Sequence, residues 1–141
     1  MLKPLALILT ASVLAGCAGS APGPATPKTF ANYNEQANNG QRLSLEGYVR
    51  LPAATLVSDT MMLELHEQPD SDKPQISFSI PIGGGANQVE QPPKDYQASD
   101  LKVRDKTGAL IAPDQKVRIS GKLIYSPSSS ILYPPIELEK L

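Results

Sequence analysis

Apolar and polar residues alternate along five segments of this chain between residues 42 and 141. Successive side chains of a β-strand point to opposite faces, so alternation predicts strands with one buried face. The expected strands are residues 42–51, 60–67, 75–82, 116–125 and 131–141. The third alternates with the fewest exceptions, and its inward positions are Ile76, Phe78, Ile80 and Ile82. The pattern predicts an all-β domain.

The same alternation assigns the faces of the other strands. The inward residues are Leu43, Leu45 and Val49 in the first strand, Met61, Leu63 and Leu65 in the second, Val117, Ile119, Leu123 and Ile124 in the fourth, and Ile136, Leu138 and Leu141 in the last. Met62, Glu64 and His66 fall on the outward face of the second strand. Interior glycines Gly47 and Gly121 indicate a bulge or a sharp bend. Proline cannot donate to a ladder, so Pro81 predicts an edge or bulge at the end of the third strand, and Pro134-Pro135 predict an edge at the start of the last.

Two segments depart from the strand pattern. Residues 29–39 fit a short helix that Thr29 caps and Gly40 ends, with Phe30, Tyr33 and Ala37 on one face. Residues 83–113 form a long insertion between the third and fourth strands. It opens with three glycines, passes Pro92-Pro93 and contains LKVRDKTGALI, which is typical of a hairpin turning at residues 106–108. We expect two short strands there, or a strand and a turn.

Five strands, two of them kinked by a central glycine, resemble the OB-fold, a five-stranded Greek-key barrel whose first strand bends to serve both sheets. LSLEGYV and KVRISGKL look like the first and fourth strands of exported and lipoprotein versions of that barrel in bacteria. The resemblance covers residues 41–141, and it departs from the family where Gly and Pro replace the usual helix between the third and fourth strands. It implies a small OB-like barrel; another small barrel or a sandwich is the alternative.

The N-terminus has the pattern of an export signal. Residues 1–16 read MLKPLALILTASVLAG, with Lys3 ahead of an apolar run over residues 5–14. That run is shorter than the ~20 apolar residues that span a bilayer, but it suits the core of a signal peptide. An ordinary secretory signal with a chance cysteine, or a buried helix, is the alternative.

The signal ends in Leu14-Ala15-Gly16-Cys17, which resembles the lipobox of bacterial lipoprotein precursors. The resemblance implies cleavage between Gly16 and Cys17 and acylation of Cys17. Several acyl chains at about 0.8 kcal/mol per buried CH₂ would make the membrane attachment effectively permanent. Ala18 stands where Asp retains such proteins at the inner membrane. We therefore expect an outer-membrane lipoprotein facing the periplasm, with the external face left open.

A spacer follows the cysteine. Residues 18–28 read AGSAPGPATPK, which cannot bury much apolar area and behaves as a partly extended tether. Its eleven residues reach about 30 Å at ~3 Å each. The expected organisation is a signal peptide at 1–16, the lipidated cysteine and tether at 17–28, and an OB-like β domain at 29–141.

Composition excludes several kinds of site. The 141 residues include one Cys and one His, which rules out a disulfide framework, a cysteine-cluster metal site and multi-histidine zinc ligation. Lys+Arg 13 against Asp+Glu 14 gives a net charge of −1, and removal of Lys3 with the signal leaves 12 − 14 = −2. This balance argues against a dominant phosphate-binding surface. We expect no metal and no cofactor.

No catalytic residue stands out. His66, beside Glu64 and Glu67, could serve as a base, but an outward histidine on a strand is more often solvated. The Asp70-Ser71-Asp72 turn lacks the later Gly and Glu of a calcium loop, and the glycines at 83–85 lack a following Lys-Ser or Lys-Thr. The serines at 126–130 have no placed base. We therefore expect a protein that is not an enzyme, with a carboxylate hydrolase as an alternative.

Binding is the remaining function. Cations and tyrosines that could form a binding face are Tyr48, His66, Lys102, Arg104, Arg118, Lys122 and Tyr125. Asp100, Asp105 and Asp114 interleave with the cations and argue against nucleic acid. The hypothesis is a lipid-anchored envelope protein acting as a binding or adaptor module for a protein or glycan, with a groove over the second and third strands bordered by residues 83–113. The alternatives are a structural lipoprotein that pairs with another envelope protein through a sheet edge, and an oligosaccharide- or nucleic-acid-binding barrel.

Overall fold

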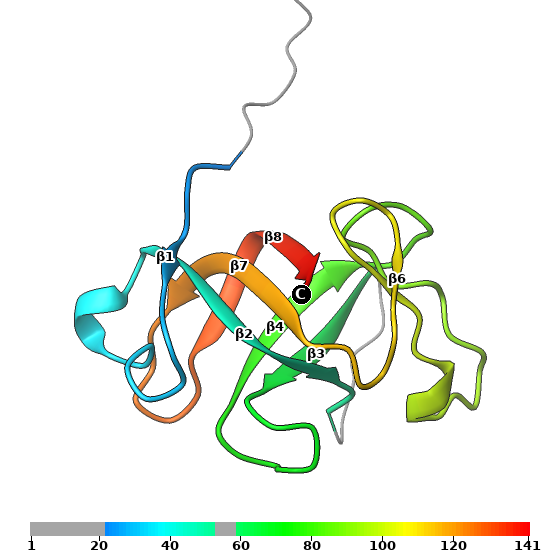
Figure 1. Ribbon diagram of the computed structural model, residues 1–141, viewed down its shortest axis with the longest axis horizontal. Coiled ribbons are helices and arrows are strands. Elements are labelled where there is room, and N and C mark those ends of the chain that lie inside the picture. The colour runs from blue at the N-terminus through cyan, green and yellow to red at the C-terminus, as the bar shows by residue number, and fades with distance from the viewer. Residues whose placement is uncertain (1–21, 53–58) are drawn as a thin grey trace, which may run out of the picture.

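Five long strands form the framework of the domain in the computed structural model, which describes residues 22–52 and 59–141 (Figure 1). Gly16 and Cys17 lie outside the described residues. The strands are β2 (Arg42–Arg50), β3 (Thr60–His66), β4 (Gln75–Pro81), β7 (Val117–Ile124) and β8 (Ile131–Lys140). Each predicted strand is present, with its ends within one residue of the predicted ones.

The strands close into a barrel. Their order is β2-β3-β4-β8-β7, and β7 pairs again with β2. Every neighbouring pair is antiparallel except β4 and β8, which pair in parallel at Ser77–Ile131 and Phe78–Leu132. The predicted all-β, OB-like barrel is therefore confirmed.

Gly47 is the point where β2 changes partner. Residues 42–47 of β2 pair with β7, and residues 48–50 pair with β3. A Cβ atom at Gly47 would lie 2.3 Å from the backbone oxygen of His66, so only glycine fits there. The predicted bend at this glycine is confirmed.

The second glycine lies at an irregularity between β7 and β8. The register shifts between Ser120 and Lys122, and a Cβ atom at Gly121 would lie 2.7 Å from Cδ1 of Ile136. Pro134 and Pro135 fall in the same irregular stretch of β8. The prediction that they place the start of the strand at an edge is wrong, because residues 131–132 pair with β4 on one side and β7 on the other.

The N-terminal segment adds a short edge strand. β1 (Thr26–Pro27) pairs in parallel with β2, so the sheet includes residues before the expected boundary at residue 29. The helix predicted for residues 29–39 is replaced by a turn and a single 3₁₀ turn, η1 (Gln36–Asn38). Phe30 and Tyr33 are buried as predicted, but Ala37 is exposed. One turn is enough to bring both rings onto the core.

The insertion covers one end of the barrel. It contains a 3₁₀ turn, η2 (Ala98–Asp100), and a hairpin of β5 (Val103–Arg104) and β6 (Leu110–Ile111), as the two-strand prediction required. Val103 and Ile111 are buried and belong to the barrel core. The Asn87 side chain fixes the insertion to β8, because its Oδ1 accepts a 2.7 Å hydrogen bond from the Leu138 amide.

The core consists of the inward faces of the five strands together with residues from β1 to η1 and from the insertion. Its fully buried members are Phe78, Leu43, Leu45, Met61, Leu63, Leu65, Ile76, Ile80, Ile119, Leu123, Leu132 and Leu138. Ile124 and Leu141, both predicted to face inward, are exposed. Within the part of the chain that the structure describes, no helix has the length and apolar character needed to cross a membrane.

Candidate functional site

The predicted binding residues do not form one face. Arg118 and Lys122 lie on the outer face of β7, whereas Lys102 and Arg104 lie in the insertion around Glu90. Tyr125 is half-buried and packs against the core. Tyr48 is half-buried beside the hollow formed with the insertion. The predicted binding face grouped these residues by their chemical type, and the folded barrel places them on separate surfaces.

His66 is buried, so its predicted position on an exposed face is wrong. Its side chain is 4% exposed. Nδ1 lies 2.7 Å from the Ser71 carbonyl, and Nε2 lies 2.8 Å from Oε2 of Glu64. A carbonyl oxygen only accepts, so Nδ1 is a donor in this contact. The ring holds the β3–β4 loop against β3, and each of its two nitrogens makes one of these hydrogen bonds.

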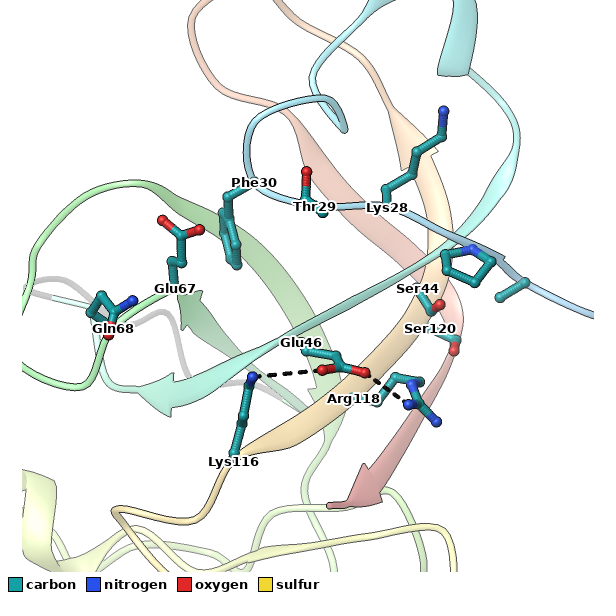
Figure 2. A pocket seen from close by; sticks show the side chains of 12 residues that line it. Lys28, Thr29, Phe30, Ser44, Glu46, Glu67, Gln68, Lys116, Arg118 and Ser120 are labelled. Carbon is teal, nitrogen blue, oxygen red and sulfur yellow. Dashed lines mark hydrogen bonds and ion pairs between the residues drawn. The ribbon is translucent and has the colours of Figure 1, made fainter.

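A hollow of about 690 Å³ lies on the outer face of β2 and β7 below the N-terminal segment (Figure 2). Glu46 lies at its centre between two cations. Oε1 accepts from Nη2 of Arg118 at 2.7 Å, and Oε2 lies 3.6 Å from Nζ of Lys116. Arg118 also donates to Glu139 at 3.1 Å, and Glu139 lies 3.2 Å from Lys106. We call this five-residue chain of alternating charges the charged face.

The charges of this face stabilise one another. The hydrogen bond from Arg118, aided by Lys116, holds the pKa of Glu46 below its usual value. The hydrogen bond from Lys106, aided by Arg118, does the same to the pKa of Glu139, and the contact with Glu46 raises the pKa of Arg118. An acid or phosphate ligand would have to displace these carboxylates before it could use the cations.

The predicted cations of the insertion are also paired. Arg104 donates to Glu90 at 2.6 Å, and Lys102 lies 3.8 Å from the same carboxylate. The hydrogen bond from Arg104, with a contribution from Lys102, lowers the pKa of Glu90. Arg104 also donates to the carbonyl of Gly108, which fixes the hairpin turn. These cations therefore support the hairpin.

A different kind of surface lies on the outer side of β3, β4 and β8. Two adjoining hollows of about 310 and 260 Å³ share Thr60, Ser79 and Pro134. Met62 and Tyr133 line the first and are 39% and 56% exposed. The second is lined by Pro81, Ala86, Asn87, Gln88, Pro135 and Ile136. We call the two hollows together the uncharged groove, because no charged residue is among the described residues that line it.

Polar groups in the uncharged groove are open to a partner. The hydroxyls of Thr60, Ser79 and Tyr133 make no hydrogen bond to another described residue. The centres of protein interfaces are rich in Tyr and Met and poor in charged residues, and the uncharged groove has this composition. The arrangement offers apolar area, three hydroxyls and no acid–base pair.

The sequence indicated only part of this groove. Met62 falls on an outward position that is otherwise polar, which is a signal for a surface contact. Tyr133 precedes two prolines in a strand whose start was predicted to lie at an edge. What the pattern lacked was the adjacency of β4 and β8, whose parallel pairing places residues 77–78 beside 131–132.

Within residues 22–52 and 59–141, no three His, Cys, Asp or Glu side chains gather closely enough to hold a metal ion. No protein-family model matches this chain, and a comparison with curated proteins gave no match.

Proposed function

We propose that this protein is a lipid-anchored outer-membrane lipoprotein, facing the periplasm, whose barrel is a non-enzymatic module that binds an envelope protein. Cys17 carries the anchor, and the residues between it and β1 form the tether. The uncharged groove is the binding surface. A partner that buries Met62 and Tyr133 gains apolar contact without breaking any ion pair of the barrel.

One observation carries this proposal. The uncharged groove joins two exposed large apolar side chains to hydroxyls without an intramolecular partner among the described residues, while the cations of the charged face are already bound to acids. Exposed apolar surface costs solubility, so a group of such residues marks an interaction site. The same observation disfavours nucleic acid or an acidic glycan as the ligand.

Pairing through a sheet edge has less support. Barrel closure gives each of the five main strands a neighbour on both sides over part of its length, which shortens the free edges. The added edge strand β1 contains Pro27, which cannot donate a hydrogen bond. A carboxylate hydrolase also lacks support, because Glu46, Glu90 and Glu139 each pair with a cation and not with a second carboxylate.

Site-specific photo-crosslinking in bacterial cells tests the groove. A benzoylphenylalanine in place of Tyr133 should give a discrete adduct with one envelope protein, and the same probe in place of Leu110, which is 45% exposed on β6, should not. Met62→Glu should abolish the Tyr133 adduct by placing a charge in the groove, whereas Leu110→Glu should leave it unchanged. Equal adducts from both positions, or insensitivity to Met62→Glu, would contradict the proposal.

The anchor is tested separately. Cys17→Ser in the full chain should abolish labelling by an alkyne-bearing fatty acid fed to the cells, and should move the protein from the membrane fraction to the soluble envelope fraction. Cys17 is the only cysteine of the chain, so no second thiol can take the lipid in its place. Ser20→Ala, three residues further on, is the matched control and should keep both the label and the anchor. A fatty-acid label that persists in the Cys17→Ser protein would overturn the lipoprotein assignment.

A further inference from the structure

A separate apolar pocket lies where the insertion meets the end of β2. It has a volume of about 220 Å³ and is bordered by residues 48–51 of the chain, by Pro69, and by the part of the insertion from η2 to Pro113. Figure 1 shows η2 and the chain after β6 beside the tip of β2. The pocket shares no lining residue with the uncharged groove.

Only short elements of the insertion, all of them among the described residues, cover this end of the barrel. The OB-like barrel has only the β5–β6 hairpin and η2 over this end within the described residues. Val103 and Ile111 fill part of the space, and Leu101 is half-buried against the same core. The remaining hollow is lined mainly by aliphatic side chains, which are Val49, Leu51, Ala98, Leu101, Val103, Ile111 and Ala112.

Only two described lining residues carry a polar group at the end of a long side chain. They are Arg50 and Tyr48. The Tyr48 hydroxyl has no hydrogen bond to a described residue. An apolar pocket with a few polar groups is the usual form of a small-molecule site, and 220 Å³ is below the ~300–1,000 Å³ of sites for drug-sized ligands.

Arg50 is held loosely. Its Nη1 lies 3.7 Å from Oδ1 of Asp72, whose side chain is 96% exposed, and 3.3 Å from the Ser71 carbonyl. An exposed ion pair of this length contributes little free energy. A ligand carboxylate could therefore replace Asp72 at small cost, unlike the carboxylates that Arg118 holds at 2.7 and 3.1 Å.

We propose that this pocket binds a small amphiphilic carboxylic acid. The carboxylate pairs with Arg50 and accepts from the Tyr48 hydroxyl, and a short aliphatic tail lies against Leu101 and Ile111. The proposal concerns a second site and does not depend on the uncharged groove or on a protein partner.

The test uses the full chain carrying Cys17→Ser, so that the protein can be studied without detergent. Sodium octanoate is titrated below its micelle concentration, with 1-octanol and octylammonium as ligands of equal chain length, while amide chemical shifts are followed by NMR. Octanoate should bind saturably, with shifts at residues lining the pocket. It should bind about tenfold more tightly than octanol, because a charge-assisted hydrogen bond contributes roughly that factor.

Two substitutions separate the parts of the site. Arg50→Gln should weaken octanoate binding about tenfold and leave octanol unchanged. Ala112→Phe should fill the hollow and abolish binding of both, and Ala98→Phe is a second filling variant should the first fail to fold. Met62→Glu, in the uncharged groove, should leave octanoate binding intact, which keeps this test distinct from that of the proposed function.

Three results would overturn the inference. They are no saturable binding of octanoate, equal binding of octanoate and octylammonium, and unchanged binding in a folded Ala112→Phe or Ala98→Phe protein.

Discussion

The charged face and the uncharged groove lie on the same barrel and share one strand, yet they use their side chains differently. The second half of β8 gives Glu139 to the charged face, and the first half gives Tyr133 to the groove. The carboxylates of the charged face are satisfied within the molecule, whereas the groove hydroxyls have no partner among the described residues. The density of charges on a surface is therefore a poor guide to binding when those charges already neutralise one another.

Gly47→Ala should disrupt both surfaces at once, because β2 reaches β7 and β3 by bending at this residue. A methyl group 2.3 Å from the backbone oxygen of His66 forces the strands apart. We expect a loss of about 3 kcal/mol in the free energy of unfolding, measured by urea denaturation. Gly84→Ala is the matched control, since nothing lies within 4 Å of its added Cβ, and its effect should stay within about 0.5 kcal/mol. Equal losses would contradict the bend.

Asp105→Ala should loosen the hairpin that covers the barrel end, together with Lys106 of the charged face, and leave the uncharged groove in place. Oδ1 of Asp105 accepts from the Thr107 amide at 2.8 Å and the Ala109 amide at 3.1 Å, and Asp105 is 5% exposed. Removing the acceptor leaves these donors unpaired, which costs about 2 kcal/mol. Amide hydrogen exchange should rise at residues 103–111 before it rises in the five main strands. Uniform exchange would contradict a local role.

Acidification should weaken the charged face and leave the groove unaffected. The pKa values of Glu46 and Glu139 are lowered by their cations. Burial alone would raise the pKa of Asp105, but hydrogen bonds from Thr107 and Ala109 bring it below its usual value. Groups with a lowered pKa in the folded state contribute stability above the unfolded pKa of about 4, and this is lost as pH falls through the folded pKa.

Urea denaturation at pH 7, 5 and 3 checks this expectation. The free energy of unfolding should be nearly constant from pH 7 to pH 5 and lower at pH 3, and Asp105→Asn should reduce the acid-induced difference. An increase in stability at pH 3 would contradict the assigned pairs.

A smaller effect is expected from the ion pair at the centre of the charged face. A double-mutant cycle of Arg118→Ala and Glu46→Ala should give a coupling of at most about 1 kcal/mol, because both side chains are about 40% exposed. The coupling should fall in 1 M NaCl, where the Debye length is ~3 Å. A coupling that does not change in high salt would indicate that the ion pair is buried, which would contradict the structure.

The smallest change in stability should come from the groove itself. Met62→Glu and Leu110→Glu replace residues that are 39% and 45% exposed, so each should alter the free energy of unfolding by no more than about 0.5 kcal/mol. Any loss of crosslinking in Met62→Glu is then a loss of contact and not of folding. A large destabilisation confined to Met62→Glu would make the groove part of the barrel's structural support.

The alternation of residues located the barrel strands because the apolar positions within each strand mark the face that is buried. The prediction of a short helix after Thr29 was wrong, because a single 3₁₀ turn suffices to bury Phe30 and Tyr33. The prediction that Ile124 and Leu141 face inward was also wrong, because these residues lie beyond the end of the core. The alternation also predicted the wrong exposure for His66. The outward position on β3 was right, but the loop that folds over it comes from residues 67–74, and local alternation carries no information about such cover.

Residue type and local spacing were enough to locate the strands and the bend at Gly47, because each of these is a property of a short stretch of chain. Which outward residues meet is a property of the folded barrel. Met62, Ser79 and Tyr133 lie on three strands far apart in the chain, and the parallel pairing of β4 with β8 brings them together. Arg118 is likewise neutralised by acids from β2 and β8. The register of strand pairing and the closure of the barrel bring these groups together, and the alternation within a single strand determines neither of them.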